Sequence, residues 1–266
     1  MKYYHIDSFT SELFRGNPAG VCLLDYDIPD AVKQKIAAET GHPETAFVLR
    51  NGKGYHLRWF TPNVEVPLCG HATLAAAHAL WQENEVPGSE TIHFETLSGV
   101  LSVKKLEDGT MQMDFPIYKP ERRPLPQQVA EAIKADIVDC LYYFDRYLLE
   151  LGSEHEVRNL QPDHEKLTQV KCIITAKTEA GSRYDFVSRF FAGAVGVPED
   201  PVTGSAHCCL VPYWAAKTGR QKFLAYQASE RGGELQLELK GDRVLIGGVA
   251  ATFCKGAIEI ALTGNN

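Results

Sequence analysis

Glu65-Val-Pro-Leu-Cys-Gly-His-Ala72 and Glu199-Asp-Pro-Val-Thr-Gly-Ser-Ala206 are the two stretches that decide the fold of this chain. They are identical at four of eight positions, at an offset of 134 residues. Each one leads into a mostly apolar segment, Gly70–Gln82 in the first copy and Gly204–Lys217 in the second. A helix that is apolar on most sides is buried. The sequence therefore predicts two buried helices, each entered through a similar loop.

Further matches lie on both sides of these octamers. Gly99–Val103 falls on Gly233–Leu237 at the same offset, and Arg58–Phe60 falls on Arg189–Phe191 at an offset of 131. Three ordered matches in similar surroundings predict an internal duplication, because chance explains one short match more easily than three. We therefore expect two similar halves.

Most of the remaining chain has the pattern of β-strands. Apolar and β-branched residues alternate or run together between turn residues, as strands require. Segments with this pattern are Met1–Asp7, Ala19–Leu24, Thr45–Arg50, Gly54–Thr61, Leu101–Lys105, Thr110–Phe115, Leu235–Leu239 and Arg243–Gly247. Pro29–Thr40 is predicted to be a further helix, with Pro near its start and Gly41 after its end. The prediction is an α+β protein with two sheets, each wrapped around one helix.

Four prolines between Pro116 and Pro126 mark the connection between the halves, since such segments act as stiff connectors. We expect an N-terminal repeat over residues 1–117, joined by a last strand at about 256–264, and a C-terminal repeat over 118–255. Equivalent loops of the two repeats can then face each other across a cleft, which is a common place for ligands.

Composition narrows the class of protein. The chain has 266 residues, 44% of them hydrophobic, and a formal net charge of −7 with no Lys/Arg-rich run. This argues against nucleic-acid binding, which depends on clustered cations. Seven cysteines without CxxC spacing favour free thiols over a disulfide framework or a zinc ribbon. No signal-peptide pattern or long apolar run is present, so we expect a cytoplasmic protein without membrane contact.

Chemistry is expected at the two helix starts, at Gly70 and Gly204. The first N–H groups of a helix lack partners within it, and the helix dipole places partial positive charge there. Two such starts in one cleft form a site for a carboxylate or a developing enolate. Each loop alone is explained as simply by tight chain geometry; the repetition favours the functional interpretation.

The side chains at the two loops differ between the copies. Glu65, Cys69 and His71 belong to the first loop, and Glu199, Asp200, Thr203 and Ser205 belong to the second. A similar scaffold with different side chains suits a reaction in which one face takes a proton and the other supports the substrate.

Glu44 is a further candidate, at the start of an apolar strand. Burial beside apolar residues raises the pKa of a carboxyl, which would suit it for acid–base chemistry near pH 7. A glutamate that merely ends the strand in solvent is the alternative. Asn17, in a Gly-Asn-Pro sequence, is predicted to shape a turn.

Five motifs in order resemble the PhzF-like (phenazine biosynthesis-like) family of the diaminopimelate epimerase-like superfamily. They are Phe14–Gly20, Glu44–Phe47, Arg58–Pro62, Cys69–Ala75 and Glu199–Ala206. The resemblance implies two similar halves, each a curved mixed β-sheet around a central apolar helix, with the active site between them. It also implies an isomerase that moves a proton on a small anionic, carboxylate-containing metabolite, without a metal or organic cofactor, and in many members a homodimer.

The resemblance also implies roles for individual residues. Glu44, His71 and Asp200 are the expected catalytic residues. The expected substrate-binding residues are Ser205, Gly70, Gly204, Ala72 and Thr203.

Two other hypotheses remain open at this point. The epimerases of the superfamily use two cysteines, and here Cys69 is matched by Thr203, whose hydroxyl pKa is too high for a base without strong help. An epimerase, racemase or dehydratase that uses Cys69 with Thr203 is therefore the first alternative. A non-catalytic module that binds a small molecule is the second, because a fold does not fix a function.

Overall fold

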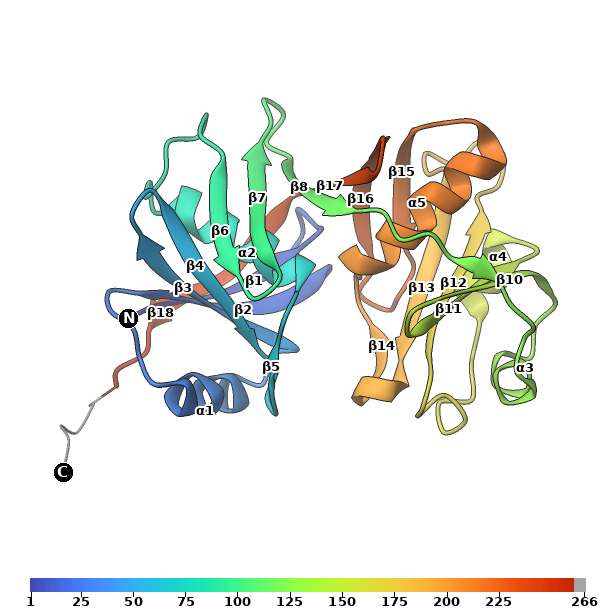
Figure 1. Ribbon diagram of the computed structural model, residues 1–266, viewed down its shortest axis with the longest axis horizontal. Coiled ribbons are helices and arrows are strands. Elements are labelled where there is room, and N and C mark those ends of the chain that lie inside the picture. The colour runs from blue at the N-terminus through green and yellow to red at the C-terminus, as the bar shows by residue number, and fades with distance from the viewer. Residues whose placement is uncertain (261–266) are drawn as a thin grey trace.

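The computed structural model describes residues 1–260, which form two lobes side by side (Figure 1). The strands of the N-terminal part are β1 (Lys2–Ser8), β2 (Asn17–Leu24), β3 (Glu44–Asn51), β4 (Gly54–Phe60), β5 (Glu65–Val66), β6 (Ile92–Thr96), β7 (Gly99–Lys105), β8 (Met111–Pro116) and β9 (Glu121–Arg122). Those that follow are β10 (Ile137–Tyr143), β11 (Arg146–Leu151), β12 (Lys171–Lys177), β13 (Phe186–Ala192), β14 (Val197–Asp200), β15 (Lys222–Gln227), β16 (Gly233–Lys240), β17 (Arg243–Gly248) and β18 (Ala250–Ala257). The helices are α1 (Asp30–Thr40), α2 (Gly70–Gln82), α3 (Gln127–Ile133), α4 (Glu154–Asn159), α5 (Gly204–Thr218) and the short 3₁₀ helix η1 (Gly193–Val195).

The two lobes repeat the same order of strand pairings. In the first, β1 is antiparallel to β2, β2 is parallel to β3, β3 is antiparallel to β4, and β4 is parallel to β6. In the second, β10, β11, β12, β13 and β15 are joined in the same sequence of antiparallel and parallel contacts. This is a mixed sheet with few helices, and the α+β prediction is confirmed.

The two apolar segments form the central helices, as predicted. The first spans the predicted Gly70–Gln82, and ten of its thirteen residues are buried. The second ends at Thr218, one residue beyond the prediction. The helix predicted at Pro29–Thr40 begins at Asp30, because Pro29 is its N-cap, and it ends at Thr40, before the C-cap Gly41 with φ of 66°.

Strand contacts join the lobes. Strand β8 pairs with β17 across the junction, and β18 returns to pair with β1. In the connection, β9 pairs with β10 of the second lobe. A last strand beside the N-terminal half was expected at about 256–264, whereas β18 spans Ala250–Ala257. Residues 261–264 of the expected strand lie outside the described residues. The limits 1–117 and 118–255 stay a prediction, and the connection between them contains the two-residue strand β9.

Two equivalent ion pairs stabilise the loops before the central helices. Arg58 Nε and Nη2 donate to the Glu65 carboxylate at 2.7 Å each. Arg189 donates to Glu199 in the same way, at 2.7 and 2.8 Å. Bidentate pairs of this kind fix geometry as well as adding energy. Both glutamates of the repeated motif are therefore structural partners of the repeated arginines.

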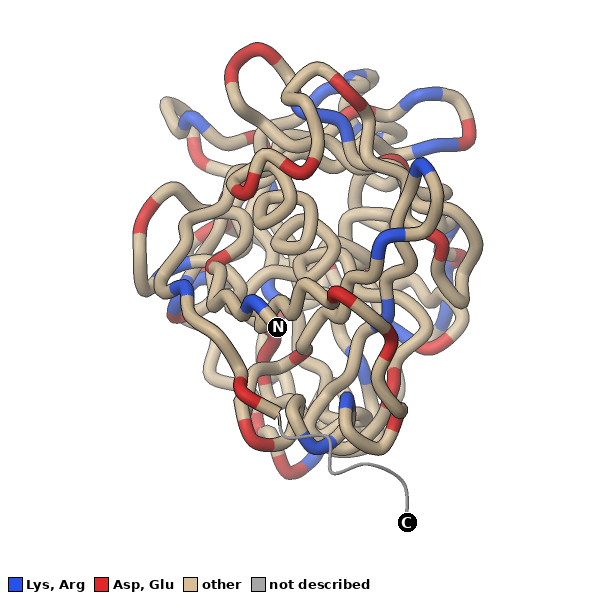
Figure 2. Tube along the Cα trace, turned by 90° about the vertical axis from the view of Figure 1, so that its left-hand side faces the viewer, with Lys and Arg blue, Asp and Glu red and all other residues tan. Residues whose placement is uncertain are grey.

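Acidic and basic positions are interspersed along the chain, as Figure 2 shows from the side of the N-terminal half. None of the helices in residues 1–260 combines the length and the apolar character needed to cross a membrane.

Candidate active site

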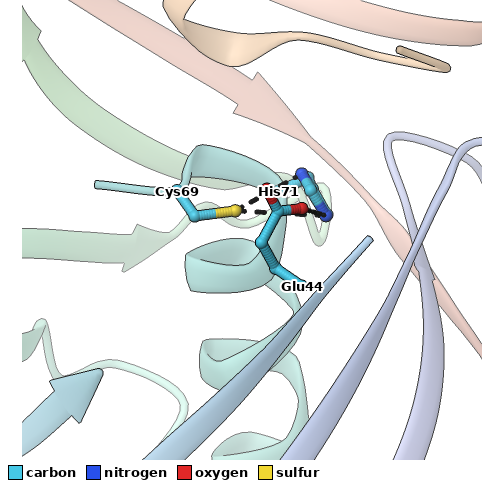
Figure 3. A group of neighbouring side chains, drawn as sticks. All are labelled: Glu44, Cys69 and His71. Atoms are coloured by element: carbon cyan, nitrogen blue, oxygen red, sulfur yellow. Dashed lines mark hydrogen bonds and ion pairs between the residues drawn. The ribbon is translucent and has the colours of Figure 1, made fainter. Parts of the chain in front are cut away.

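Glu44 is the first residue of β3, opposite Ala19 of the parallel strand β2. Its side chain is 22% exposed and points toward the start of α2 (Figure 3). Its Oε2 atom lies 3.3 Å from His71 Nε2. The sequence left open whether this glutamate ends in solvent; the structure places it against a buried histidine.

Cys69 and His71 come from the first turn of α2. Cys69 is the N-cap, in an extended conformation, and His71 is the second helical residue, with 5% of its surface exposed. The Cys69 sulphur lies 3.5 Å from His71 Nδ1. A side chain at this position of the helix stands beside the free N–H groups, so Glu44 and His71 meet where the helix is electropositive.

The starts of the two central helices meet. A Cβ atom added to Gly70 would lie 3.6 Å from Gly204 Cα, so the backbones approach closely at these two glycines. Ala72 is fully buried, and its N–H is directed at the Cys69 sulphur. The first turns of α2 and α5 therefore place their free N–H groups in one region of the molecule.

Asp200 ends β14 and belongs to the same cluster from the other lobe. Its Oδ1 accepts a hydrogen bond of 2.8 Å from Asn17 Nδ2, and its Oδ2 accepts one of 2.5 Å from the Thr203 hydroxyl. Thr203 is the N-cap of α5, and its N–H donates to Gln227 Oε1 at 2.8 Å. The Thr203 hydroxyl proton is thus engaged with a carboxylate, which makes this residue a support for Asp200.

Ser205 is the second residue of α5, in the position that His71 has in α2. Its Oγ accepts a hydrogen bond of 3.0 Å from Arg146 Nη1, while Arg146 Nε donates to Asp145 at 2.7 Å. The sequence reasoning missed Arg146. The register of the parallel strands shows its place in the site. Arg146 is opposite Lys171 in the pair β11–β12, just as Ala19 is opposite Glu44 in the pair β2–β3. The start of β11 therefore corresponds to the part of β2 that lies beside Glu44.

The pKa values separate the roles of these groups. Burial raises the pKa of Glu44 to about 8; the charge of Asp200 adds to the rise, and a hydrogen bond with Cys69 opposes it. Burial raises the pKa of Asp200 to about 6, against hydrogen bonds from Thr203 and Asn17. Burial lowers the pKa of His71 to about 3, so its contact with Glu44 at neutral pH is a hydrogen bond of a neutral imidazole. Two carboxyls with different raised pKa values are typical of acid–base sites.

Cys69 is a thiol near neutral pH. Burial raises its pKa well above the usual value, and the nearby charge of Glu44 raises it further. A thiolate, the nucleophilic and metal-binding form, is therefore disfavoured in this position.

Glu44, Cys69 and His71 also form the kind of group that can hold a metal ion. One ligand atom from each lies within 4.8 Å of the others. Three protein ligands with one open position are the pattern of catalytic zinc sites. Such a site uses the deprotonated thiol, a form that burial of Cys69 disfavours unless a bound cation stabilises it. The expectation of a reaction without metal stays a prediction.

Two concavities lie elsewhere on the molecule. One of about 420 Å³ is lined by Lys33, Phe47 and His56 among others, and one of about 310 Å³ by Phe9 and Arg183 among others. Neither is lined by a predicted catalytic residue. The candidate site is chosen on its chemistry, because buried ionisable groups from both lobes converge there.

A family model, curated relatives and solved structures all match this chain along almost its whole length. A family model described as phenazine biosynthesis-like protein matches residues 6–256. An uncharacterized isomerase of Halalkalibacterium halodurans is 44% identical over 262 residues, which cover 96% of this chain and 97% of the relative. The crystal structure of a phenazine biosynthesis protein PhzF family member from Enterococcus faecalis aligns with a TM-score of 0.92 and 41% identity, over 97% of this chain and 99% of that one.

A more distant structure bears on the fold alone. A predicted epimerase of Pseudomonas aeruginosa aligns with a TM-score of 0.76 at 20% identity, over 98% of this chain and 99% of the other. The predicted epimerase-like fold is confirmed.

Proposed function

The chain belongs to the phenazine biosynthesis-like (PhzC-PhzF) family, and on that premise we propose that it is a cofactor-independent isomerase in which Glu44 moves a proton on a small anionic metabolite. Relatives that carry the name isomerase support the class of reaction. The observation that carries the proposal is the contact of Glu44, a carboxyl with a raised pKa, with neutral His71 at the start of α2.

The chemistry follows from the charges. The ionised Glu44 carboxylate takes a proton from a C–H bond next to a carboxylate or a conjugated double bond. The electron pair of that bond moves into the conjugated system, and negative charge develops on an oxygen. Free N–H groups at Gly70 and Gly204 and the hydroxyl of Ser205 stabilise that oxygen. Glu44–H then returns the proton to a different carbon, so atoms and charge balance without a redox partner.

Arg146 and Asp200 differentiate the two sides of the site. Arg146 holds the Ser205 oxygen as an acceptor, which leaves the hydroxyl proton of Ser205 free to donate to a substrate oxygen. Asp200, whose oxygens both accept hydrogen bonds, adds negative charge near Glu44 and raises its pKa. The N-terminal lobe thus supplies the base, and the anion is bound by the helix starts of both lobes together with Ser205 of the C-terminal lobe.

The pH dependence of kcat/KM tests the role of Glu44 as a base. With a pKa of about 8, the reactive carboxylate is the minor form at pH 7. We therefore expect kcat/KM to rise with pH and to level off above about pH 8, with an apparent pKa near 8 in the free enzyme. Initial rates from pH 6 to pH 9.5 measure it. A rate that falls through pH 8 would mean that the protonated carboxyl acts first.

Substitution of Cys69 by Ala separates this proposal from an epimerase or dehydratase that uses Cys69 with Thr203. The Cys69 thiol is protonated and the Thr203 hydroxyl donates to Asp200, so neither is set up as a base. Cys69→Ala is expected to keep kcat/KM within about threefold of wild type, a change of roughly 0.7 kcal/mol. A loss of several orders of magnitude in a folded variant would favour the two-residue alternative.

Incubation in D₂O with a library of carboxylic-acid metabolites tests catalysis against mere binding. Mass spectrometry then shows which compound gains a deuteron, without knowledge of the product. Labelling by wild type in the presence of EDTA, and its absence with Glu44→Gln, supports the proposal. Compounds that bind but are never labelled or converted would support the non-catalytic module.

A further inference from the structure

Asn17 lies at the junction of the two lobes. It is the first residue of β2 and is fully buried, whereas the sequence suggested a turn residue. Its Nδ2 atom is 2.8 Å from Asp200 Oδ1 and 2.8 Å from the Val202 carbonyl oxygen, both of the C-terminal lobe. The same atom lies 3.2 Å from His71 Nδ1, of the N-terminal lobe.

These neighbours fix the orientation of the amide. A backbone carbonyl only accepts hydrogen bonds, so the group that faces Val202 must be the NH₂ of Asn17. The reversed amide would place its oxygen against the oxygens of both Val202 and Asp200. The amide nitrogen therefore faces His71.

The orientation of the amide determines the proton position on His71. An amide nitrogen donates hydrogen bonds and does not accept them, so His71 Nδ1 cannot carry a proton toward Asn17. The second neighbour of Nδ1 is the Cys69 sulphur at 3.5 Å, which is at most a weak acceptor, so the amide nitrogen of Asn17 is the nearer and stronger influence on Nδ1. A neutral imidazole has one proton, and the amide nitrogen of Asn17 beside Nδ1 favours its location on Nε2, which faces Glu44 Oε2 at 3.3 Å.

We infer that Asn17 is a positioning residue of the reaction: its amide keeps the proton of His71 on Nε2, facing Glu44, and ties Asp200 of the other lobe to the same point. The role in the reaction rests on the proposed function, whereas the proton position on His71 does not.

The chemical consequence falls on Glu44. An Nε2–H group donates to the ionised carboxylate and stabilises the form that takes a proton. With the proton on Nδ1, a lone pair of Nε2 would face Glu44 Oε2, and the carboxyl would have to carry a proton to make the contact favourable. Asn17, the hydrogen-bonding neighbour of His71 Nδ1, thus influences whether Glu44 is ionised or protonated.

Long-range ¹H–¹⁵N NMR of histidine-labelled protein measures the proton position directly. The His71 signals are assigned by their loss in His71→Asn. Wild type is expected to show a protonated Nε2 and an unprotonated Nδ1 for His71 from pH 6 to pH 8. A protonated Nδ1 in wild type would overturn the inference, whether or not any variant folds.

Asn17→Asp is designed to reverse which nitrogen of His71 carries the proton in the NMR spectrum. A carboxyl oxygen at this place accepts a hydrogen bond, so the His71 proton is expected to move to Nδ1. Asn17→Leu, of similar shape, removes the donor and is expected to reduce the preference for Nε2. Asn63→Asp, at an exposed position, is the matched control for added charge and should leave the His71 signals unchanged. Retention of the wild-type signals by both Asn17 variants would contradict the inference.

Kinetics link the proton position to the reaction. Asn17→Leu is expected to lower kcat by about 10- to 100-fold, the range found for loss of an outer partner, with a much smaller change in KM. Wild-type kcat in a variant with altered His71 signals would confine Asn17 to a structural role. If Glu44→Gln keeps wild-type kcat while wild type shows the expected His71 NMR signals, the proposed function is overturned. The proton position on His71 is then still supported.

Discussion

Glu44→Gln is expected to lower kcat by about a thousandfold, within the range for loss of a general acid–base group. The amide keeps the shape of the side chain and its contact with His71, but it cannot take a proton from carbon. KM should change little, because the groups proposed to bind the anion are Ser205 and the helix starts. Steady-state rates on a compound found by the deuterium screen measure the effect.

Glu39→Gln is the matched control, since Glu39 is an exposed glutamate of α1 only five residues away. Its rate should equal that of wild type. A Glu44→Gln variant with more than about a tenth of wild-type kcat would remove Glu44 from the chemical step.

The same substitution is expected to stabilise the protein at alkaline pH. The pKa of Glu44 is raised from 4.5 to about 8 in the folded state, so the unfolded chain loses this proton first as the pH rises. Stability contributed by the protonated carboxyl is therefore present at pH 4 and is lost between about pH 4.5 and pH 8. The full shift corresponds to roughly 5 kcal/mol. Partial exposure of the side chain reduces the expectation to about 2–4 kcal/mol.

Urea denaturation of wild type and Glu44→Gln at pH 5 and pH 9 checks this expectation. The difference in unfolding free energy between the two proteins should increase in favour of the variant at pH 9, because Gln does not ionise. Comparison at two pH values cancels any effect of the substitution itself. An unchanged difference would show that the folded protein does not raise the pKa of Glu44.

The parts of the fold that depend on local pattern were predictable. The central helix Gly70–Gln82 follows from its apolar composition, and the hairpins β7–β8 and β16–β17 follow from their Gly-containing turns. Helix α4 was missed although its signal is present in the sequence. Ser153 and Glu156 form a capping box, in which each side chain bonds the backbone of the other.

The site was predictable where one lobe supplies it and less so where the lobes meet. Glu44 and His71 were predicted from motifs, and the structure brings them together. The contact of Asn17 with Asp200 joins residues 183 positions apart. It depends on how β8 and β17 align the lobes, which no local pattern encodes. The contact of Arg146 with Ser205 likewise needs the hairpin β10–β11 to be in place.

Several expectations stay predictions. The repeated order of strand pairings and the paired Arg58–Glu65 and Arg189–Glu199 contacts are consistent with an internal duplication. A homodimer, a cytoplasmic location and the small anionic substrate depend on the family resemblance and on composition.

Deuterium content of the product formed in D₂O tests the central claim most directly. Wild type should place one solvent deuteron on the carbon that receives the proton, or return part of the original proton if Glu44 exchanges slowly with solvent. Glu44→Gln should give neither product nor label in the recovered substrate. Labelling at the wild-type rate by the Glu44→Gln variant would show that another group moves the proton.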